Sequence, residues 1–188
     1  SVLSGAGPEE RAEMAMQSVL EHLVDWNLGV IRLFTPPFDQ APWDPGYIKG
    51  YVPGVRENGG QYTHAAVWVT MAAARLRQTE TAWRLFHTIN PIAHGDTPER
   101  IERYKVEPYV VAADVYTAQG HEGRGGWTWY TGSAAWMYRL LTDTLLGLRL
   151  EVDRLRMEPV LPPGWKGYTI HYRYRNTVYH IKVSVAGP

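Results

Sequence analysis

The chain has 188 residues, no cysteine, and equal numbers of basic and acidic residues, 19 of each. This length suits one domain, or one domain with a small appendage. The zero net charge provides no basic field for nucleic acid, and no apolar run approaches the ~18 residues of a membrane span. We therefore expect no nucleic-acid partner, no membrane span and no disulfide; residues 1–5 also lack a signal-peptide pattern, which favours a cytoplasmic location.

The first half of the chain is predicted to alternate helices with one long loop. Residues 8–24 form a helix because apolar residues recur every three and four positions and Pro8 suits a first turn. Residues 25–60 are broken by Pro and Gly, and a loop this long in a compact domain usually has a function. Helices are expected at residues 62–76 and 79–88, and another begins at Pro98 with Thr97 as its cap.

The second half is predicted to end in β structure. Residues 109–116 are interpreted as helical, 120–126 as a Gly-rich loop and 131–148 as a strong helix. Residues 155–159 form a strand, and residues 168–175 and 178–185 form a hairpin around a turn at 176–177. A lone hairpin is marginal in water, so this part must pack on something else. We expect one unit over residues 1–150 and a β element over residues 151–188.

Two Gly-rich stretches, residues 55–64 and 125–133, indicate a binding site. Each places polar groups in a turn that opens a predicted helix. Glycine lets the backbone approach a ligand closely, and a helix N-terminus suits an anion. The chain also has 8 Trp and 12 Tyr against 3 Phe. Trp and Tyr combine an apolar face with a polar edge, as sugar-binding platforms do, although many of them could simply fill the core.

Four blocks of the sequence, in order, resemble glycoside hydrolase family ninety-four, the inverting phosphorylases of β-linked sugars. Within that family they are most similar to the C-terminal phosphorylase-like region of cyclic β-1,2-glucan synthases. The resemblance covers nearly the whole chain, and its blocks are Ile31–Phe38, Glu57–Gly60 with His64, Tyr104–Val110 and Gly126–Trp136.

The resemblance implies a mainly α fold: the later part of an (α/α)6 barrel followed by a small C-terminal antiparallel β element. The chain differs from the family at the general acid. In the family this acid is the first Asp of an Asp-Trp-Asn-Asp motif, and the motif is absent here. Asp25-Trp26-Asn27 is followed by Leu28, and Asp25 lies only 39 residues before His64. We interpret this match as a coincidence, so the catalytic acid is unknown. An upstream phosphate-holding Arg of the family also has no assignable counterpart.

By resemblance, His64, Thr131 and Gly132 match the phosphate-binding residues of the family. An imidazole and a hydroxyl donate hydrogen bonds to anionic oxygens, and the first N–H groups of a helix can complete such an anion-binding site. The alternatives are a buried histidine at a helix start for His64 and an ordinary cap for Thr131.

The sugar would be bound by carboxylates and aromatic rings. Glu57 matches a sugar-binding position, with a surface acid as the alternative, and Glu107 either binds sugar or holds Arg103 or Lys105. The aromatic candidates for the subsites are Tyr109 and Trp129, together with Trp127 and Tyr130, of which about half are expected to be core residues.

Other chemistries have little support in the sequence. His87 and His94 are seven residues apart, and His121-Glu122 lacks a partner at helical spacing, so no metal site is expected. No Ser lies in a nucleophile elbow. No cofactor is expected, because inorganic phosphate would be the co-substrate.

The leading hypothesis is the C-terminal part of a β-glucan phosphorylase-type enzyme, acting in reversible phosphorolysis or in chain-length control during cyclic β-1,2-glucan synthesis. Its partners would be a β-linked glucose oligosaccharide and phosphate. The chain would pack with the missing part of the barrel or self-associate, in the cytoplasm or within a larger inner-membrane protein. The alternative is a non-catalytic carbohydrate-binding fragment, and a water-using hydrolase of similar barrel type is a weaker third hypothesis.

Overall fold

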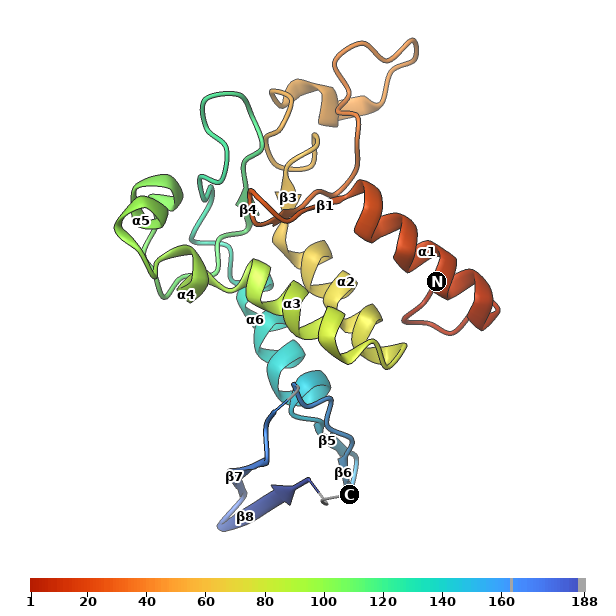
Figure 1. The fold of residues 1–188 in the computed structure, drawn as a ribbon, viewed down its shortest axis with the longest axis vertical. Helices are drawn as coiled ribbons and strands as arrows, with labels where there is room; N and C mark the ends of the chain where they lie inside the picture. The colour runs from red at the N-terminus through yellow and green to blue at the C-terminus, as the bar shows by residue number, and fades with distance from the viewer. Residues whose placement is uncertain (163, 186–188) are drawn as a thin grey trace.

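The structure is a computed structural model that describes residues 1–162 and 164–185. Helices form its middle, a group of loops lies at one end and two β-hairpins lie at the other (Figure 1). The helices are α1 (Glu9–His22), α2 (Thr63–Arg75), α3 (Thr79–Ile89), α4 (Pro91–His94), α5 (Pro98–Tyr104) and α6 (Thr131–Arg139), with a 3-10 helix η1 (Gly46–Gly50) and a π-helix η2 (Leu140–Leu145).

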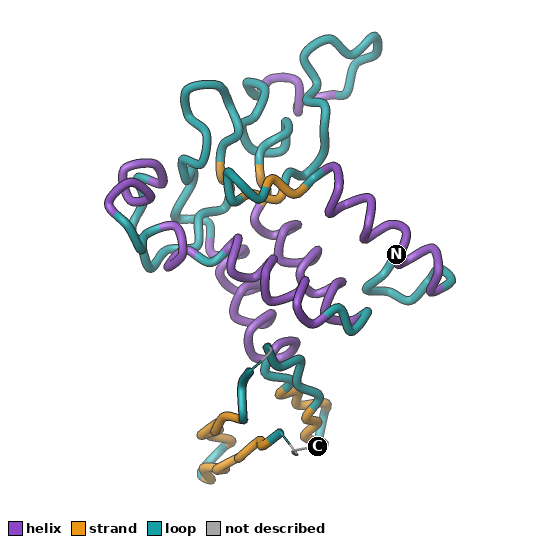
Figure 2. The backbone as a smooth tube through the Cα atoms, in the orientation of Figure 1, coloured by secondary structure: helices purple, strands orange, loops and turns teal. Residues whose placement is uncertain are grey.

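The strands pair as four separate two-stranded antiparallel sheets. Two of these sheets lie near the loops and two at the hairpin end, as Figure 2 shows. The pairs are β1 (Val24–Asp25) with β2 (Val30–Ile31), β3 (Gln61–Tyr62) with β4 (Asp114–Val115), β5 (Leu148–Glu151) with β6 (Arg154–Met157), and β7 (Gly167–Tyr174) with β8 (Thr177–Ser184). The chain is therefore helix-rich with small antiparallel hairpins at its C-terminal end.

Helix α2 lies at the centre of the main core, packed between α3 and α6. Its buried face is largely alanine, at positions 66, 72, 73 and 74. Such small side chains allow neighbouring helices to approach closely. Leu85 of α3 and Leu140 at the start of η2 are fully buried against this face. The predicted helices at 62–76 and 79–88 are confirmed.

A tight turn joins α2 to α3. The N–H of Gln78 donates to the carbonyl of Ala73 and that of Arg77 to Ala74, each at 3.0 Å. Arg77 adopts the left-handed conformation, with φ of 58°. These bonds form the Schellman arrangement that ends many helices. Thr97 likewise caps α5, as predicted, by accepting the N–H of Arg100.

The predicted helix over residues 109–116 is wrong. This segment is extended, and its last part forms β4 between β3 and the Gly-rich loop. Ala113 accepts the N–H of Thr63 at 2.9 Å and donates its own N–H to Trp127 at 2.8 Å. Residues 112–115 are all buried. Partners on both sides therefore satisfy the backbone of this segment and override its local helical pattern.

The predicted helix over residues 131–148 ends early. Helix α6 widens into η2, and Leu148 already belongs to β5, a strand that the sequence did not indicate. Gly147 turns the chain, with φ of 73°, and a Cβ there would lie 2.3 Å from the backbone of Glu158. The backbone of Glu158 and Pro159 therefore leaves no space for a side chain at position 147.

The predicted C-terminal hairpin is confirmed, with its turn at Arg175 and Asn176, one residue earlier than expected. The ring of Trp165, before β7, packs on Trp83 of α3 at 5.5 Å, and the Tyr168 hydroxyl donates to the carbonyl of Leu146. These contacts tie the base of the hairpin to the helices. The expected β element, residues 151–188, includes residues 163 and 186–188, which lie outside the described residues.

Within residues 1–162 and 164–185, no helix combines the length and the apolarity needed to cross a bilayer. The first helix, α1, has only Met16 buried among its residues, so most of its surface faces outward.

Candidate functional site

The loop before α2 is shaped by a buried asparagine and a close glycine. Asn58 is fully buried, and its side-chain amide donates to the carbonyl of Tyr51 at 2.8 Å and accepts the N–H of Phe38 at 2.6 Å. A Cβ on Gly60 would lie 2.8 Å from the carbonyl oxygen of Arg56. The loop therefore closes tightly on itself and holds residues 56 and 57 at its tip.

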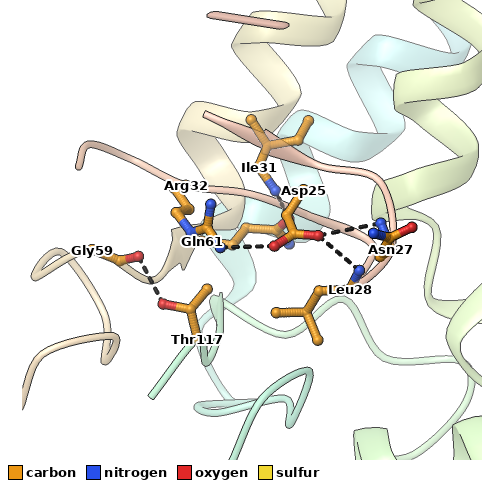
Figure 3. Close-up of polar contacts among 8 residues, drawn as sticks. All are labelled: Asp25, Asn27, Leu28, Ile31, Arg32, Gly59, Gln61 and Thr117. Carbon is orange, nitrogen blue, oxygen red and sulfur yellow. Dashed lines mark hydrogen bonds and ion pairs between the residues drawn. The ribbon is translucent and has the colours of Figure 1, made fainter. Parts of the chain in front are cut away.

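Thr117, in a second loop, forms hydrogen bonds to the loop before α2. Thr117 donates its N–H to the carbonyl of Gly54 at 2.8 Å. Its hydroxyl donates to the carbonyl of Gly59 at 2.9 Å (Figure 3). The buried side chain of Gln61 accepts the N–H of Ile31 at 2.9 Å, which ties β3 to β2. The Gly-rich turn is thus anchored by segments far away in the sequence.

Asp114 in β4 is a buried carboxylate that the Gly-rich loop surrounds. One of its oxygens, Oδ1, accepts the N–H of Trp127 at 2.9 Å, while Oδ2 is buried without a hydrogen-bond partner. A Cβ on Gly126 would lie 2.4 Å from this carboxylate. Burial raises the pKa of the Asp114 carboxyl, and the Trp127 N–H and the charge of Arg56 oppose that rise.

Glu57 and Arg56 share the electrostatic environment of Asp114. Oε2 of Glu57 is also buried without a hydrogen-bond partner. The carboxylate of Glu57 raises the pKa of Asp114 further. The pKa of the Arg56 guanidinium is raised chiefly by the nearby side chain of Tyr51, and the two carboxylates add to the rise. Two carboxylates with free buried oxygens beside one cation can accept hydrogen bonds from the hydroxyls of a polar ligand.

The N-termini of α2 and α6 lie side by side. Tyr62 precedes α2 and Tyr130 precedes α6. Burial raises the pKa of the Tyr62 hydroxyl, and the nearby side chain of Tyr130 adds to the rise. Tyr62 also pairs directly with Asp114 across β3 and β4. The two Gly-rich stretches of the sequence therefore meet at one place.

His64 lies in the first turn of α2 among aromatic rings. Its ring stacks on Trp136 of α6 with centroids 5.3 Å apart, and the ring of Trp68 meets its edge at 4.7 Å. Its Nε2 is buried without a hydrogen-bond partner. Burial lowers the pKa of His64, which favours the neutral imidazole in the free protein.

Thr131 and Gly132 form the first turn of α6. Neither α2 nor α6 has a side-chain cap, although the N–H of Thr63, the first of α2, already donates to the carbonyl of Ala113. Ser133 is buried and its hydroxyl donates to the carbonyls of Val111 and Tyr130, which holds the start of α6 in place. Thr131 itself is exposed.

The remaining candidates are exposed on the surface. Glu107 is exposed, Tyr109 is 79 % exposed and Trp129 is 88 % exposed. Within the described part of the chain, none of these three side chains makes a hydrogen bond or an ion pair. Their predicted sugar contacts therefore rest on the family resemblance alone.

The hydrogen bonds and the ion pair of Asp25 stabilise a turn of the backbone. Asp25 stands at the turn between β1 and β2, where its carboxylate accepts the N–H groups of Asn27 and Leu28 and pairs with Arg32 at 2.8 Å (Figure 3). The Leu28 N–H, followed by Arg32, lowers the pKa of Asp25. A carboxylate held in its charged form is poorly suited to act as a general acid.

Two protein-family models match consecutive parts of the chain. Residues 1–147 match the model of the glycosyl hydrolase 94 superfamily, catalytic domain, and residues 148–187 match that of the glycosyl hydrolase family 65, C-terminal domain. The chain belongs to the glycosyl hydrolase 94 superfamily.

Similar proteins include a glucan synthase and several phosphorylases. The chain is 52% identical over 184 residues to the cyclic beta-(1,2)-glucan synthase NdvB of Rhizobium meliloti (strain 1021), covering 98% of this chain and 6% of that protein. It is 32% identical to the N,N'-diacetylchitobiose phosphorylase of Vibrio furnissii and 28% identical to the solabiose phosphorylase of Paenibacillus borealis, covering 97% of this chain each time and 22% and 23% of the relatives. The chain thus spans only a small part of the relatives it matches.

Sequence reasoning missed Asp114, Arg56 and Tyr62. Asp114 was hidden inside a predicted helix, and its burial depends on the Gly-rich loop that packs over it. The available signal was Gly126, because a glycine before an aromatic cluster can indicate a close approach of another group. Among the described residues, no group of three or more His, Cys, Asp and Glu side chains could hold a metal ion.

Proposed function

We propose that this chain is the C-terminal part of a β-glucan phosphorylase-type enzyme and supplies the phosphate seat and part of the sugar site. The observation that carries the proposal is the meeting of two uncapped helix N-termini beside the carboxylates of Glu57 and Asp114. Family membership and the phosphorylases among its relatives support it.

The residues have the following proposed roles. His64, Thr131 and Gly132 bind phosphate through the imidazole Nε2, the hydroxyl and the first N–H groups of α6. Glu57, joined now by Asp114, accepts hydrogen bonds from sugar hydroxyls, because each presents a buried oxygen without a partner. Glu107, Tyr109 and Trp129 remain proposed outer sugar contacts.

The reaction would be an inverting phosphorolysis. A general acid protonates the leaving glycosidic oxygen, and a phosphate oxygen bonds to the anomeric carbon from the opposite face, which converts a β-glucoside to α-glucose 1-phosphate. The charge of phosphate removes the need for a strong protein base. The acid would come from outside this chain, since Asp25 is engaged with Arg32 and the turn N–H groups.

The proposed architecture is the later part of an (α/α)6 barrel over residues 1–150, followed by the β element over residues 151–188. Helices α2 and α6 pack together with their N-termini at the same end, as neighbouring helices of one ring would. The missing part of the barrel is the proposed partner, and the proposed location is the cytoplasm, within a larger protein.

Binding of phosphate to the chain tests this function. We expect saturable quenching of tryptophan fluorescence by inorganic phosphate, weakened about tenfold or more in His64→Ala and Thr131→Val. Tyr138→Phe, on the exposed side of α6, is the matched control. Sugar binding without any phosphate binding would favour the alternative function, a carbohydrate-binding fragment. Release of glucose 1-phosphate by the chain alone, lost in Asp25→Asn, would overturn the assignment of the acid to another segment.

A further inference from the structure

Two histidines face each other across the C-terminal hairpin. His171 in β7 is the direct partner of His180 in β8, and the centroids of their imidazole rings lie 4.7 Å apart at an interplanar angle of 77°. The two residues are far enough apart in the sequence that only the register of the hairpin brings them together. The proposed phosphate and sugar site lies at the starts of α2 and α6, whereas the hairpin lies beyond the opposite ends of these helices (Figure 1).

The register places this pair where the side chains of two antiparallel strands are closest. The N–H of Val185 donates to the carbonyl of Lys166 at 3.0 Å, so these two residues form a hydrogen-bonded pair in the same register. Hydrogen-bonded and non-hydrogen-bonded pairs alternate along antiparallel strands. His171 lies an odd number of positions after Lys166 and therefore faces His180 in a non-hydrogen-bonded pair. In such pairs the Cα atoms are about 4.5 Å apart.

The pair lies on the outward face of the hairpin. Both histidines are exposed, whereas the other face of β7 carries Tyr168, whose hydroxyl donates to the carbonyl of Leu146 at the end of the helices. Within residues 1–162 and 164–185, neither imidazole makes a side-chain hydrogen bond or an ion pair. Their ring nitrogens are therefore accessible to a ligand from solvent.

Two neighbouring neutral imidazoles are suited to bind a divalent transition-metal ion. Nitrogens at about 2.0–2.1 Å from one tetrahedral zinc ion lie roughly 3.3 Å from each other. Rings whose centroids are 4.7 Å apart reach this separation by rotation about the side-chain bonds. Water completes the coordination shell, since the site is open to solvent.

We propose that His171 and His180 together bind one divalent transition-metal ion, with zinc as the probe, and that the ion links β7 to β8. A two-stranded hairpin is marginal by itself in water, and an ion bound only by the paired strands stabilises that pairing. Arg173 and Lys182 occupy neighbouring positions on the same face, and their positive charges oppose the ion. Their long flexible stems let the charged ends turn away from it.

Isothermal titration calorimetry of zinc chloride into the full chain, at about pH 7.5 where an unperturbed imidazole is largely neutral, tests the proposal. We expect one zinc ion per chain, and an affinity about tenfold or more lower in His171→Gln and in His180→Gln. His121→Gln, at an exposed histidine elsewhere in the chain, is the matched control and keeps the affinity. Lys182→Gln removes a neighbouring positive charge and should tighten binding. Circular dichroism without zinc confirms that each variant is folded.

A second measurement on the wild-type chain does not depend on the variants. Zinc should slow hydrogen exchange in β7 and β8, and magnesium, which prefers oxygen ligands, should not. Unchanged zinc affinity in both Gln variants would show an adventitious ion only and overturn the proposal. Unchanged exchange in the two strands, or one zinc ion per two chains with zinc-dependent dimerisation, would overturn the link within one hairpin.

Discussion

At the scale of single residues, the site depends on groups whose polar atoms are buried but not hydrogen-bonded. The described part of the chain has five such residues, and Glu57, His64 and Asp114 lie in or beside the proposed site. A buried polar atom without a partner costs about 1–3 kcal/mol, so a fold retains it chiefly where a ligand completes it. The buried polar atoms of Glu57, His64 and Asp114 that lack hydrogen bonds are therefore consistent with a binding role.

The proposed contact of His64 with an anion predicts that anion binding depends on pH. Burial holds its pKa below 6.5 in the free protein, and a bound anion would raise that pKa by favouring imidazolium. Binding then takes up a proton, so affinity is highest below the free-state pKa and falls as pH rises toward the bound-state pKa. Sulfate titrations across this range should show the decline in the wild-type chain and a flat response in His64→Gln. A pH-independent wild-type affinity would contradict anion contact by this imidazole.

Gly126 should be intolerant of even a methyl group. An alanine there would place Cβ 2.4 Å from the carboxylate of Asp114 and force it away from the N–H of Trp127. We expect Gly126→Ala to lower the free energy of unfolding by about 1–3 kcal/mol in urea denaturation. Gly7→Ala, where nothing lies within 4 Å of the added Cβ, is the control. Equal stability of the two variants would show that the loop relaxes around Asp114.

At the scale of elements, the helices and the C-terminal hairpin depend on each other through a few contacts. The indole N–H of Trp83 in α3 donates to the carbonyl of Val160 at 2.6 Å, and its ring packs on Trp165 before β7. Val160 is buried, so its carbonyl has little access to water. Trp83 therefore anchors the segment between the helices and the hairpin, together with the N–H of Val160, which donates to the carbonyl of Leu145 at 2.9 Å.

Trp83→Phe should therefore weaken this anchor. The variant keeps an aromatic ring but removes the donor to Val160, and we expect a loss of about 1–2 kcal/mol in unfolding free energy. Hydrogen exchange should also become faster in β7 and β8. Trp43→Phe is the control, because Trp43 is exposed on the long loop. If the two variants show the same hydrogen-exchange rates in β7 and β8, contacts other than that of Trp83 hold the hairpin.

At the scale of the whole molecule, the helices leave one side open. A groove of about 1210 Å³ runs along α2 and α6, with Trp68, Met71 and Trp136 among its lining residues and Ser1–Ser4 at its edge. Charged residues, among them Arg75, Arg139 and Glu158, also line the groove, and its exposed tryptophan Trp68 is the kind of apolar group that another segment or chain often covers. The proposed occupant is the part of the family's catalytic region that this chain does not span.

The isolated chain should therefore associate. Sedimentation velocity at micromolar concentration should show a species that grows with concentration, together with binding of an apolar dye. A charge in the groove, Trp68→Glu, should reduce both, whereas Tyr138→Glu outside the groove should not. A monomer at all concentrations, without dye binding, would show that the helices are complete without a partner and would contradict the barrel proposal.

The sequence by itself determined the elements with a strong local pattern. Apolar periodicity placed α1 and the start of α6, and apolar content with a short link placed α2 and α3. The Thr97–Pro98 pair placed the start of α5, and strict alternation placed the β7–β8 hairpin. The two Gly-rich motifs also indicated the family, which the matched models show. Each of these signals lies within a few residues of the feature that it predicts.

Only the tertiary structure decided what depends on distant partners. Residues 109–116 became extended because β3 and the Gly-rich loop satisfy their backbone, and that pairing buried Asp114 beside Arg56 and Glu57. The strand β5 likewise depends on its pairing with β6, and the N–H of Glu158 donates to the carbonyl of Gly147 at 3.0 Å beside it. Hydrogen bonds between residues far apart in the chain outweigh local preference, and no short stretch of sequence carries their partners.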